Sequence, residues 1–236
     1  MDAAGYTTLT RQSGLMRQME VIAQNIANAS TTGFRREGVI FSEHVARLDD
    51  APSLSMARGN TRHTDLSQAG VTQTGGTFDL AIEGEGFFLV QTPQGERLTR
   101  AGGFATDAGG YLVTPDGFQL LDAGGAPVFV PPDARSVAIA ADGSLSADGA
   151  PLTQIGLWQP SDPISLRHQA GTLLSADGVE PAEGGQILQG ALEDSNVDPL
   201  TEIARMIQVQ RAYELGQTFL DREDDRIRSV VSTLGR

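Results

Sequence analysis

The sequence predicts an α+β protein in which long N- and C-terminal helices pair as a coiled-coil-like domain, with a mainly-β, antiparallel central domain between them. Two observations support this expectation. Apolar residues near both ends recur at alternating steps of three and four, which is the spacing of one helix face. Between the ends, short apolar runs alternate with turns that contain Asp-Gly or Pro-Asp-Gly, which is typical of short strands joined by tight turns.

The N-terminal segment is predicted to be helical over about its first thirty residues. Its apolar stripe consists of Leu15, Met19, Ile22, Ile26 and Ala29. Gly33 follows a run of Ser and Thr and is a stop signal, because glycine readily adopts the left-handed conformation that ends a helix.

The C-terminal segment carries a clearer helix signal. Asp198 is a good N-cap, and Pro199 suits the first helical position. The three-and-four pattern then continues through Met206, Val209, Tyr213, Gly216, Leu220, Glu223, Ile227, Val230 and Leu234. A helix of about 36 residues would be roughly 54 Å long, which is typical of a coiled coil or a helical array.

The middle of the chain divides by its pattern. Residues 36–77 are polar and mixed and are predicted to be an extended connector, whereas residues 78–194 form the β-rich body. Residues 1–35 and 195–236 together form the predicted helical assembly domain. Within the body, two hairpins are expected, one around residues 87–99 and one around 111–121.

Composition and charge exclude several functions. The chain has no Cys and no Lys, which removes disulfides, thiolate metal sites, P-loop nucleotide sites and Schiff-base chemistry. The net charge of −13 argues against nucleic-acid binding, and no apolar run is long enough to insert into a membrane. The N-terminus lacks the basic start and apolar run of a cleavable signal, so none is expected. Residues 38–194 hold the whole net charge, while both ends are nearly balanced.

The sequence shows no pattern that points to catalysis, a metal or a cofactor. Its three histidines, His44, His63 and His168, lack metal-site spacing, and the Asp-Gly pairs do not form a calcium-binding loop. Gly84-Glu85-Gly86 lacks the third glycine and the helix of a dinucleotide site. We therefore expect a protein that is not an enzyme and has no cofactor.

Three blocks of the chain resemble the flagellar basal-body rod and hook protein family. Residues 25–35 carry an Asn-x-x-Asn helix end, a Thr-x-Gly-Phe turn and a basic residue. The second block covers residues 78–88, 98–104 and 110–114, and the third covers 190–198 and 206–214. The blocks occur in the family's order, and the opening residues and length are most similar to the proximal rod members.

The resemblance implies a structural subunit of the periplasmic rod that polymerises through its terminal helices into a tubular drive shaft for motility. It also implies export by the flagellar type III apparatus without a cleaved signal peptide. The implied partners are other rod subunits, of like and unlike kind, in a helical array. The expected assembly interface consists of Leu15, Met19, Ile22, Asn25, Ile26, Asn28, Gly33, Phe34, Met206, Tyr213, Leu220, Ile227, Val230 and Leu234.

Two alternatives stay open on the sequence. One is another axial subunit of the same family, such as a distal rod or hook-like protein. The other belongs to a different class: a secreted, β-rich, carbohydrate-active enzyme, which would need a pair of carboxylates in a cleft.

Overall fold

The chain forms two compact units, seen here in a computed structural model. The model describes residues 3–48, 51–169 and 171–234, with the side chains of residues 8–40, 62–169 and 171–233. The terminal unit consists of Met1–Ala27, Glu37–His63 and Asp198–Arg236, and the body unit consists of Asn28–Arg36 and Thr64–Val197. Neither helix of the described chain has the length and apolar character that crossing a membrane requires.

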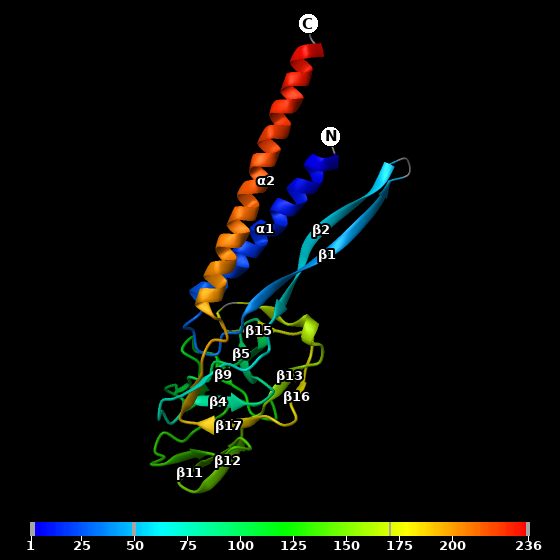
Figure 1. Ribbon diagram of the computed structural model, residues 1–236. Helices are drawn as coiled ribbons and strands as arrows, with labels where there is room; N and C mark the ends of the chain where they lie inside the picture. Colours follow the sequence, from blue (N-terminus) through cyan, green and yellow to red (C-terminus); the bar gives the residue numbers. More distant parts are fainter. Residues whose placement is uncertain (1–2, 49–50, 170, 235–236) are drawn as a thin grey trace. The chain divides into compact units, whose positions relative to one another are not determined.

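The terminal unit contains two helices and a two-stranded ribbon (Figure 1). Helix α1 spans Ala3–Ala27 and helix α2 spans Pro199–Leu234, and the ribbon is made of β1, Glu37–Leu48, and β2, Ala51–Thr64. The helices lie antiparallel, because Gln12 of α1 donates a hydrogen bond to the Tyr213 carbonyl and Asn25 donates one to Glu202. The ribbon falls within the predicted connector, where the polar sequence did not show two strands of this length.

Helix α2 begins at the residue that its local sequence predicts. The Asp198 side chain accepts a hydrogen bond from the Leu200 N–H at 3.0 Å and one from the Thr201 hydroxyl at 2.6 Å. Pro199 occupies the first position, where a missing N–H costs nothing. The predicted N-cap and helix length are therefore confirmed, whereas α1 ends at Ala27, six residues before the predicted stop at Gly33.

The expectation of a coiled-coil-like terminal domain is wrong, although the α+β class with two helices and a mainly-β centre holds. The C-terminal end of α1 lies beside the start of α2, but α1 has 25 residues and α2 has 36. The excess, about 16 Å at 1.5 Å per residue, lies at the C-terminal end of α2. Ile227 and Val230 of the predicted seam are consequently 45% and 48% exposed. The contact between the helices also includes polar Gln12 and helix-weakening Gly216, unlike an apolar heptad seam.

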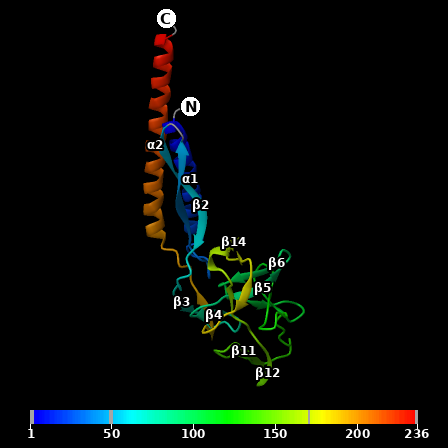
Figure 2. The same cartoon turned by 90° about the vertical axis from the view of Figure 1, so that its right-hand side faces the viewer.

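The body unit is built from short antiparallel strands (Figure 2). Its largest sheet has seven strands in the order β14-β15-β6-β5-β9-β8-β7. These strands span Arg167–His168, Leu174–Ser175, Gly95–Thr99, Phe88–Thr92, Gln119–Leu120, Leu112–Val113 and Ala105–Thr106. Both predicted hairpins are confirmed, because β5 pairs with β6 and β8 pairs with β9, each antiparallel.

Four smaller sheet groups complete the body. A three-stranded sheet contains β10 (Val137–Ile139), β11 (Ser144–Ala147) and β12 (Ala150–Gln154). Three strand pairs join β13 (Trp158–Pro160) to β16 (Val179–Pro181), β17 (Gln186–Gln189) to β4 (Leu80–Glu83), and β18 (Ala191–Glu193) to β3 (Val71–Gln73). A single 3₁₀ turn, η1, covers Pro163–Ser165.

The body has its own apolar core, which explains why it is compact. One cluster gathers Leu80, Phe88, Leu112, Leu120 and Leu145, all fully buried, together with further apolar residues of these strands, of other strands and of the loops between them. A second, smaller cluster lies on the other face of β5 and β6 and includes Leu89 and Leu98. In β5 alternate residues supply the two clusters, with Phe88 and Val90 in the first and Leu89 in the second, as the two-residue period of a strand requires.

The Asp-Gly pairs serve as turns. The Asp142 carboxylate accepts hydrogen bonds from the backbone N–H and the hydroxyl of Ser144, while Gly143 has a φ of +85°. Asp122 holds a similar turn by accepting from the N–H groups of Gly124 and Ala126. This is the side-chain-to-backbone pattern that makes Asp favourable in tight turns.

Candidate functional site

Exposed apolar side chains concentrate on α2 of the terminal unit. Leu215 is 72% exposed and Val231 is 64% exposed, although each is large and apolar. The others on this helix are Leu200, Ile203, Ile207, Phe219, Ile227 and Val230. On α1, Leu9 and Met16 are also exposed, at 56% and 49%. An apolar surface of this extent on one long helix is typical of a protein–protein contact.

Six of the eight large, exposed apolar residues described on α2 form two groups. Ile227, Val230 and Val231 continue the side of the helix that is turned toward α1, and they are exposed because they lie beyond the N-terminal end of α1. Leu200, Ile203 and Ile207 are spaced by three and four residues and form a second face near the start of the helix. In both Figure 1 and Figure 2 the C-terminal part of α2 runs on beyond α1.

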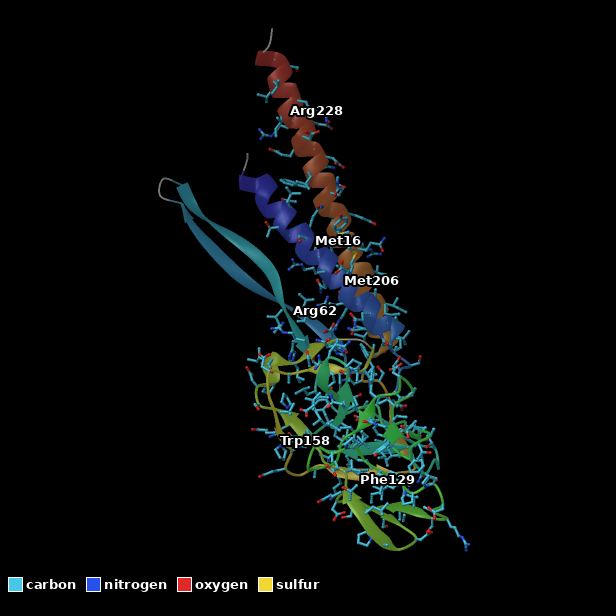
Figure 3. The ribbon with its side chains drawn as sticks, turned by 180° about the vertical axis from the view of Figure 1, so that it is seen from behind. Met16, Arg62, Phe129, Trp158, Met206 and Arg228 are labelled. Atoms are coloured by element: carbon cyan, nitrogen blue, oxygen red, sulfur yellow. The ribbon has the colours of Figure 1, made fainter. Side chains whose placement is uncertain are left out.

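The structure places the predicted interface residues in three environments. Ile22, Asn25, Gly33 and Phe34 are buried. The half-buried ones are Leu15, Met19, Ile26, Asn28, Met206, Tyr213 and Leu220. Ile227 and Val230 are exposed, and the side chain of Leu234 lies outside the described residues. Figure 3 shows Met16 and Met206 on the two neighbouring helices.

The sequence-based list omitted six of the eight large, exposed apolar residues described on α2, including Val231. Leu200, Ile203, Ile207, Leu215 and Phe219 do not follow the seam that was used to choose candidates. Their signal was present in the sequence as apolar residues on a second helix face. It becomes visible when the helix is read with a 3.6-residue period over its whole circumference.

In the body unit, the turn after α1 is anchored by a buried ionic cluster. Glu193 accepts hydrogen bonds from the guanidinium groups of Arg35, at 2.8 Å, and Arg100, at 3.0 Å. Its Oε1 also accepts from the Ala69 N–H at 3.0 Å, and all three charged side chains are at most 3% exposed. Burial lowers the pKa of Arg100 below its ordinary value; Glu193 opposes this shift and the charge of Arg35 adds to it.

The same turn approaches the rest of the body closely. Gly33 has a φ of +71°, and a Cβ at this position would lie 2.2 Å from the Ala101 backbone nitrogen. Its N–H donates to the Glu193 carbonyl at 2.7 Å. The ring of Phe34, fully buried, lies 5.1 Å from the ring of His168. Gly33 and Phe34 therefore have internal packing roles within this unit.

The cavities of the body unit are small and shallow. The largest of those described has a volume of about 340 Å³ and is lined by Thr31, Thr99, Thr114, Leu173 and their neighbours. Another, of about 220 Å³, has Arg100 and Phe87 in its wall. Among the described residues no group of three or more His, Asp and Glu side chains is arranged to hold a metal ion. The side chain of His44 lies outside the described residues.

Comparison with known proteins covers the chain from end to end. Three family models match: "Flagella basal body rod protein" over residues 6–35, "Flagellar hook protein FlgE/F/G D1 domain" over 81–147, and "Flagellar basal body rod FlgEFG protein C-terminal" over 188–233. The FlgF flagellar basal-body rod protein of Caulobacter vibrioides is 37% identical, covering 100% of this chain and 99% of its own. FlgF of Mesorhizobium japonicum is 34% identical over 98% and 97%, and FlgG of Bacillus subtilis is 30% identical over 96% and 97%.

Proposed function

Because this chain belongs to the flagellar basal-body rod protein family, and is a structural rod subunit of the FlgF type, we propose that its terminal unit is the part that packs against neighbouring rod subunits. The single observation that carries this is the apolar surface of α2, which continues past the N-terminal end of α1 with Ile227, Val230 and Val231 exposed. Helices of neighbouring subunits are the occupants we propose for this surface.

The physical reason is the free energy of burying these side chains. Complete burial of one Val, Leu, Ile or Phe side chain contributes about 1.5–3 kcal/mol before ordering costs. Several such residues per subunit, repeated along a tube, are sufficient to favour assembly. The interface residues that are half-buried or exposed in the single chain remain our predicted contacts: Leu15, Met19, Ile26, Asn28, Met206, Tyr213, Leu220, Ile227 and Val230.

The test places a charge on the exposed end of α2. The double change Ile227→Asp and Val231→Asp should abolish incorporation into isolated basal bodies and motility in soft agar. The matched control is Ser229→Asp, which adds a carboxylate on the same turn but on another helix face, and it should leave both unchanged. Fluorescence of Trp158, the only tryptophan, reports that the body unit is still folded. Normal incorporation of the double variant would show that this surface is not an interface.

We also propose that the chain reaches the rod through the flagellar type III export apparatus and keeps its N-terminal segment. The support is that α1 is part of the folded terminal unit, where Gln12 contacts both Tyr213 and Gln217. Cleavage of a signal peptide here would remove the partner of α2. Mass spectrometry of the chain from purified basal bodies should find the peptides of α1, and their absence would contradict the proposal.

A purely structural role, with no catalysis, completes the proposal, and the family's role in the rod supports it over a carbohydrate-active enzyme. The predicted division into an assembly domain of residues 1–35 and 195–236, a connector of 36–77 and a body of 78–194 remains a prediction about the assembled rod.

A further inference from the structure

Asn25, in the last turns of α1, has a completely buried side-chain amide. Its Oδ1 accepts a hydrogen bond from the Glu37 N–H at 2.9 Å, and its Nδ2 donates one to the Glu37 carbonyl at 2.8 Å. Glu37 is the first residue of β1. The amide therefore pairs with both backbone groups of this residue, as the peptide group of a neighbouring strand would.

The chemistry of the partners determines how this amide is oriented. A backbone N–H is a donor only, so the atom that faces it must be the amide oxygen. The nitrogen then faces two acceptors, the Glu37 carbonyl and, at 3.3 Å, the Glu202 Oε2 in the first turn of α2. Aspartate would add a third carboxylate beside those of Glu37 and Glu202, and it would lose both hydrogen bonds that the Asn25 amide donates. Asparagine therefore satisfies partners that the isosteric acid cannot.

The contacts continue from Asn25 to every element of the terminal unit. The Glu37 carboxylate, 1% exposed, pairs at 3.3 Å with Arg62 of β2, which Figure 3 labels. The Glu202 carboxylate, also 1% exposed, pairs at 2.9 Å with Arg205 of α2. A single buried side chain on α1 thus joins the start of the ribbon to the start of α2.

We propose that Asn25 is a positioning residue that fixes the direction in which the β1–β2 ribbon leaves the two helices. Its effect on assembly is indirect, because the amide has no exposed surface for a neighbour to contact. Removing the amide takes from the buried N–H and carbonyl of Glu37 the partner that Asn25 supplies, and this weakens the contact of α1 with the start of the ribbon. The consequence for the rod rests on the proposed function, because neighbouring subunits must meet the ribbon and the helix surface at one fixed angle.

The test measures the ribbon's direction in the full-length isolated chain. The absence of native cysteine allows two spin labels to be attached after Ser55→Cys, in β2, and Gln208→Cys, on an exposed position of α2. Double electron–electron resonance then gives the distribution of distances between the labels. Asn25→Asp should broaden this distribution at least two-fold, while the helical circular-dichroism signal stays unchanged.

A compensating variant separates positioning from a general loss of packing. In the double variant Asn25→Asp and Glu202→Gln, donor and acceptor are exchanged between residues 25 and 202. The new amide of residue 202 donates to the new carboxylate of residue 25. The net charge of the pair is retained and the repulsion between residues 25 and 202 is relieved, but the Glu37 carbonyl still lacks the donor that Asn25 supplied, so the distribution should narrow only in part. Asn28→Asp is the matched control, because the Asn28 Oδ1 accepts from the Thr31 hydroxyl at 3.2 Å and a carboxylate can do the same. The control should leave the distribution unchanged.

An unchanged distribution in the Asn25→Asp chain would overturn the proposal, as would a double variant that stays as broad as the single one. If the single variant loses its helical signal, the double variant decides: recovery of the signal with a partly narrowed distribution supports positioning, and no recovery overturns it. Incorporation into basal bodies is measured on Asn25→Asp and on the double variant, and not on Asn28→Asp, because Asn28 is itself a predicted contact. Normal incorporation despite a broad distribution would refute the link to assembly and leave the positioning role itself standing.

Discussion

Replacing Glu193 by Gln should strongly destabilise the body unit, because it removes the carboxylate that two buried guanidinium groups share. Arg35 and Arg100 lie 2.8 Å and 3.0 Å from its two oxygens, and none of the three side chains is more than 3% exposed. Gln has nearly the same shape, so the change acts through charge and hydrogen bonding. Arg35 and Arg100 then repel each other without the negative charge that both of them contact, and breaking a buried ion pair in this way typically costs about 3–5 kcal/mol.

The assay is urea unfolding followed by the fluorescence of Trp158, which lies in the body unit and reports that unit alone. With a slope of about 2 kcal/mol per molar urea, the midpoint should fall by roughly 1.5–2.5 M. The matched control is Glu180→Gln, an exposed glutamate whose carboxylate accepts from Gln159 at 2.9 Å, and it should change the stability by less than about 0.5 kcal/mol. A Glu193→Gln midpoint within the error of the control would refute the reasoning about this cluster.

Two further changes test local features. Gly33→Ala should lower the urea midpoint more than Gly117→Ala. Both glycines have a positive φ, so the backbone strain of the change is similar. A Cβ at residue 33 would lie 2.2 Å from the Ala101 nitrogen, whereas a Cβ at residue 117 would have nothing within 4 Å. Equal midpoints would contradict the close approach. The Thr201 hydroxyl, opposed by partial desolvation, lowers the pKa of Asp198 below its ordinary value. The ionised Asp198 cap should therefore stabilise α2 above about pH 4 and lose this effect as the pH falls through the lowered pKa. In Asp198→Asn the helical circular-dichroism signal should change less on acidification, because Asn caps a helix without titrating.

Much of the fold could be predicted because its causes are local. The N-cap at Asp198 and the proline after it are neighbours in sequence, so the start of α2 follows from a few residues. The same is true of the hairpins, whose Gly and Asp residues set the turns and whose apolar residues alternate. The rod family was also recognisable from sequence blocks alone.

The candidate site was predicted only in part. An apolar pattern shows that a helix has a face, but not whether that face is covered by another part of the same chain. The pattern therefore grouped the buried Ile22 with the exposed Val230. It also assigned Asn25 and Phe34 to the interface, whereas the structure buries both.

The amino-acid sequence by itself determined the helical ends, the β-rich centre and the kind of assembly to which the chain belongs. Only the tertiary structure decided which side chains remain available to a neighbour. Glu193 meets Arg35 across 158 positions of sequence, and Asn25 meets Glu202 across 177. Contacts between residues so far apart depend on how the whole chain packs, and no local pattern of hydrophobicity or turn chemistry encodes them.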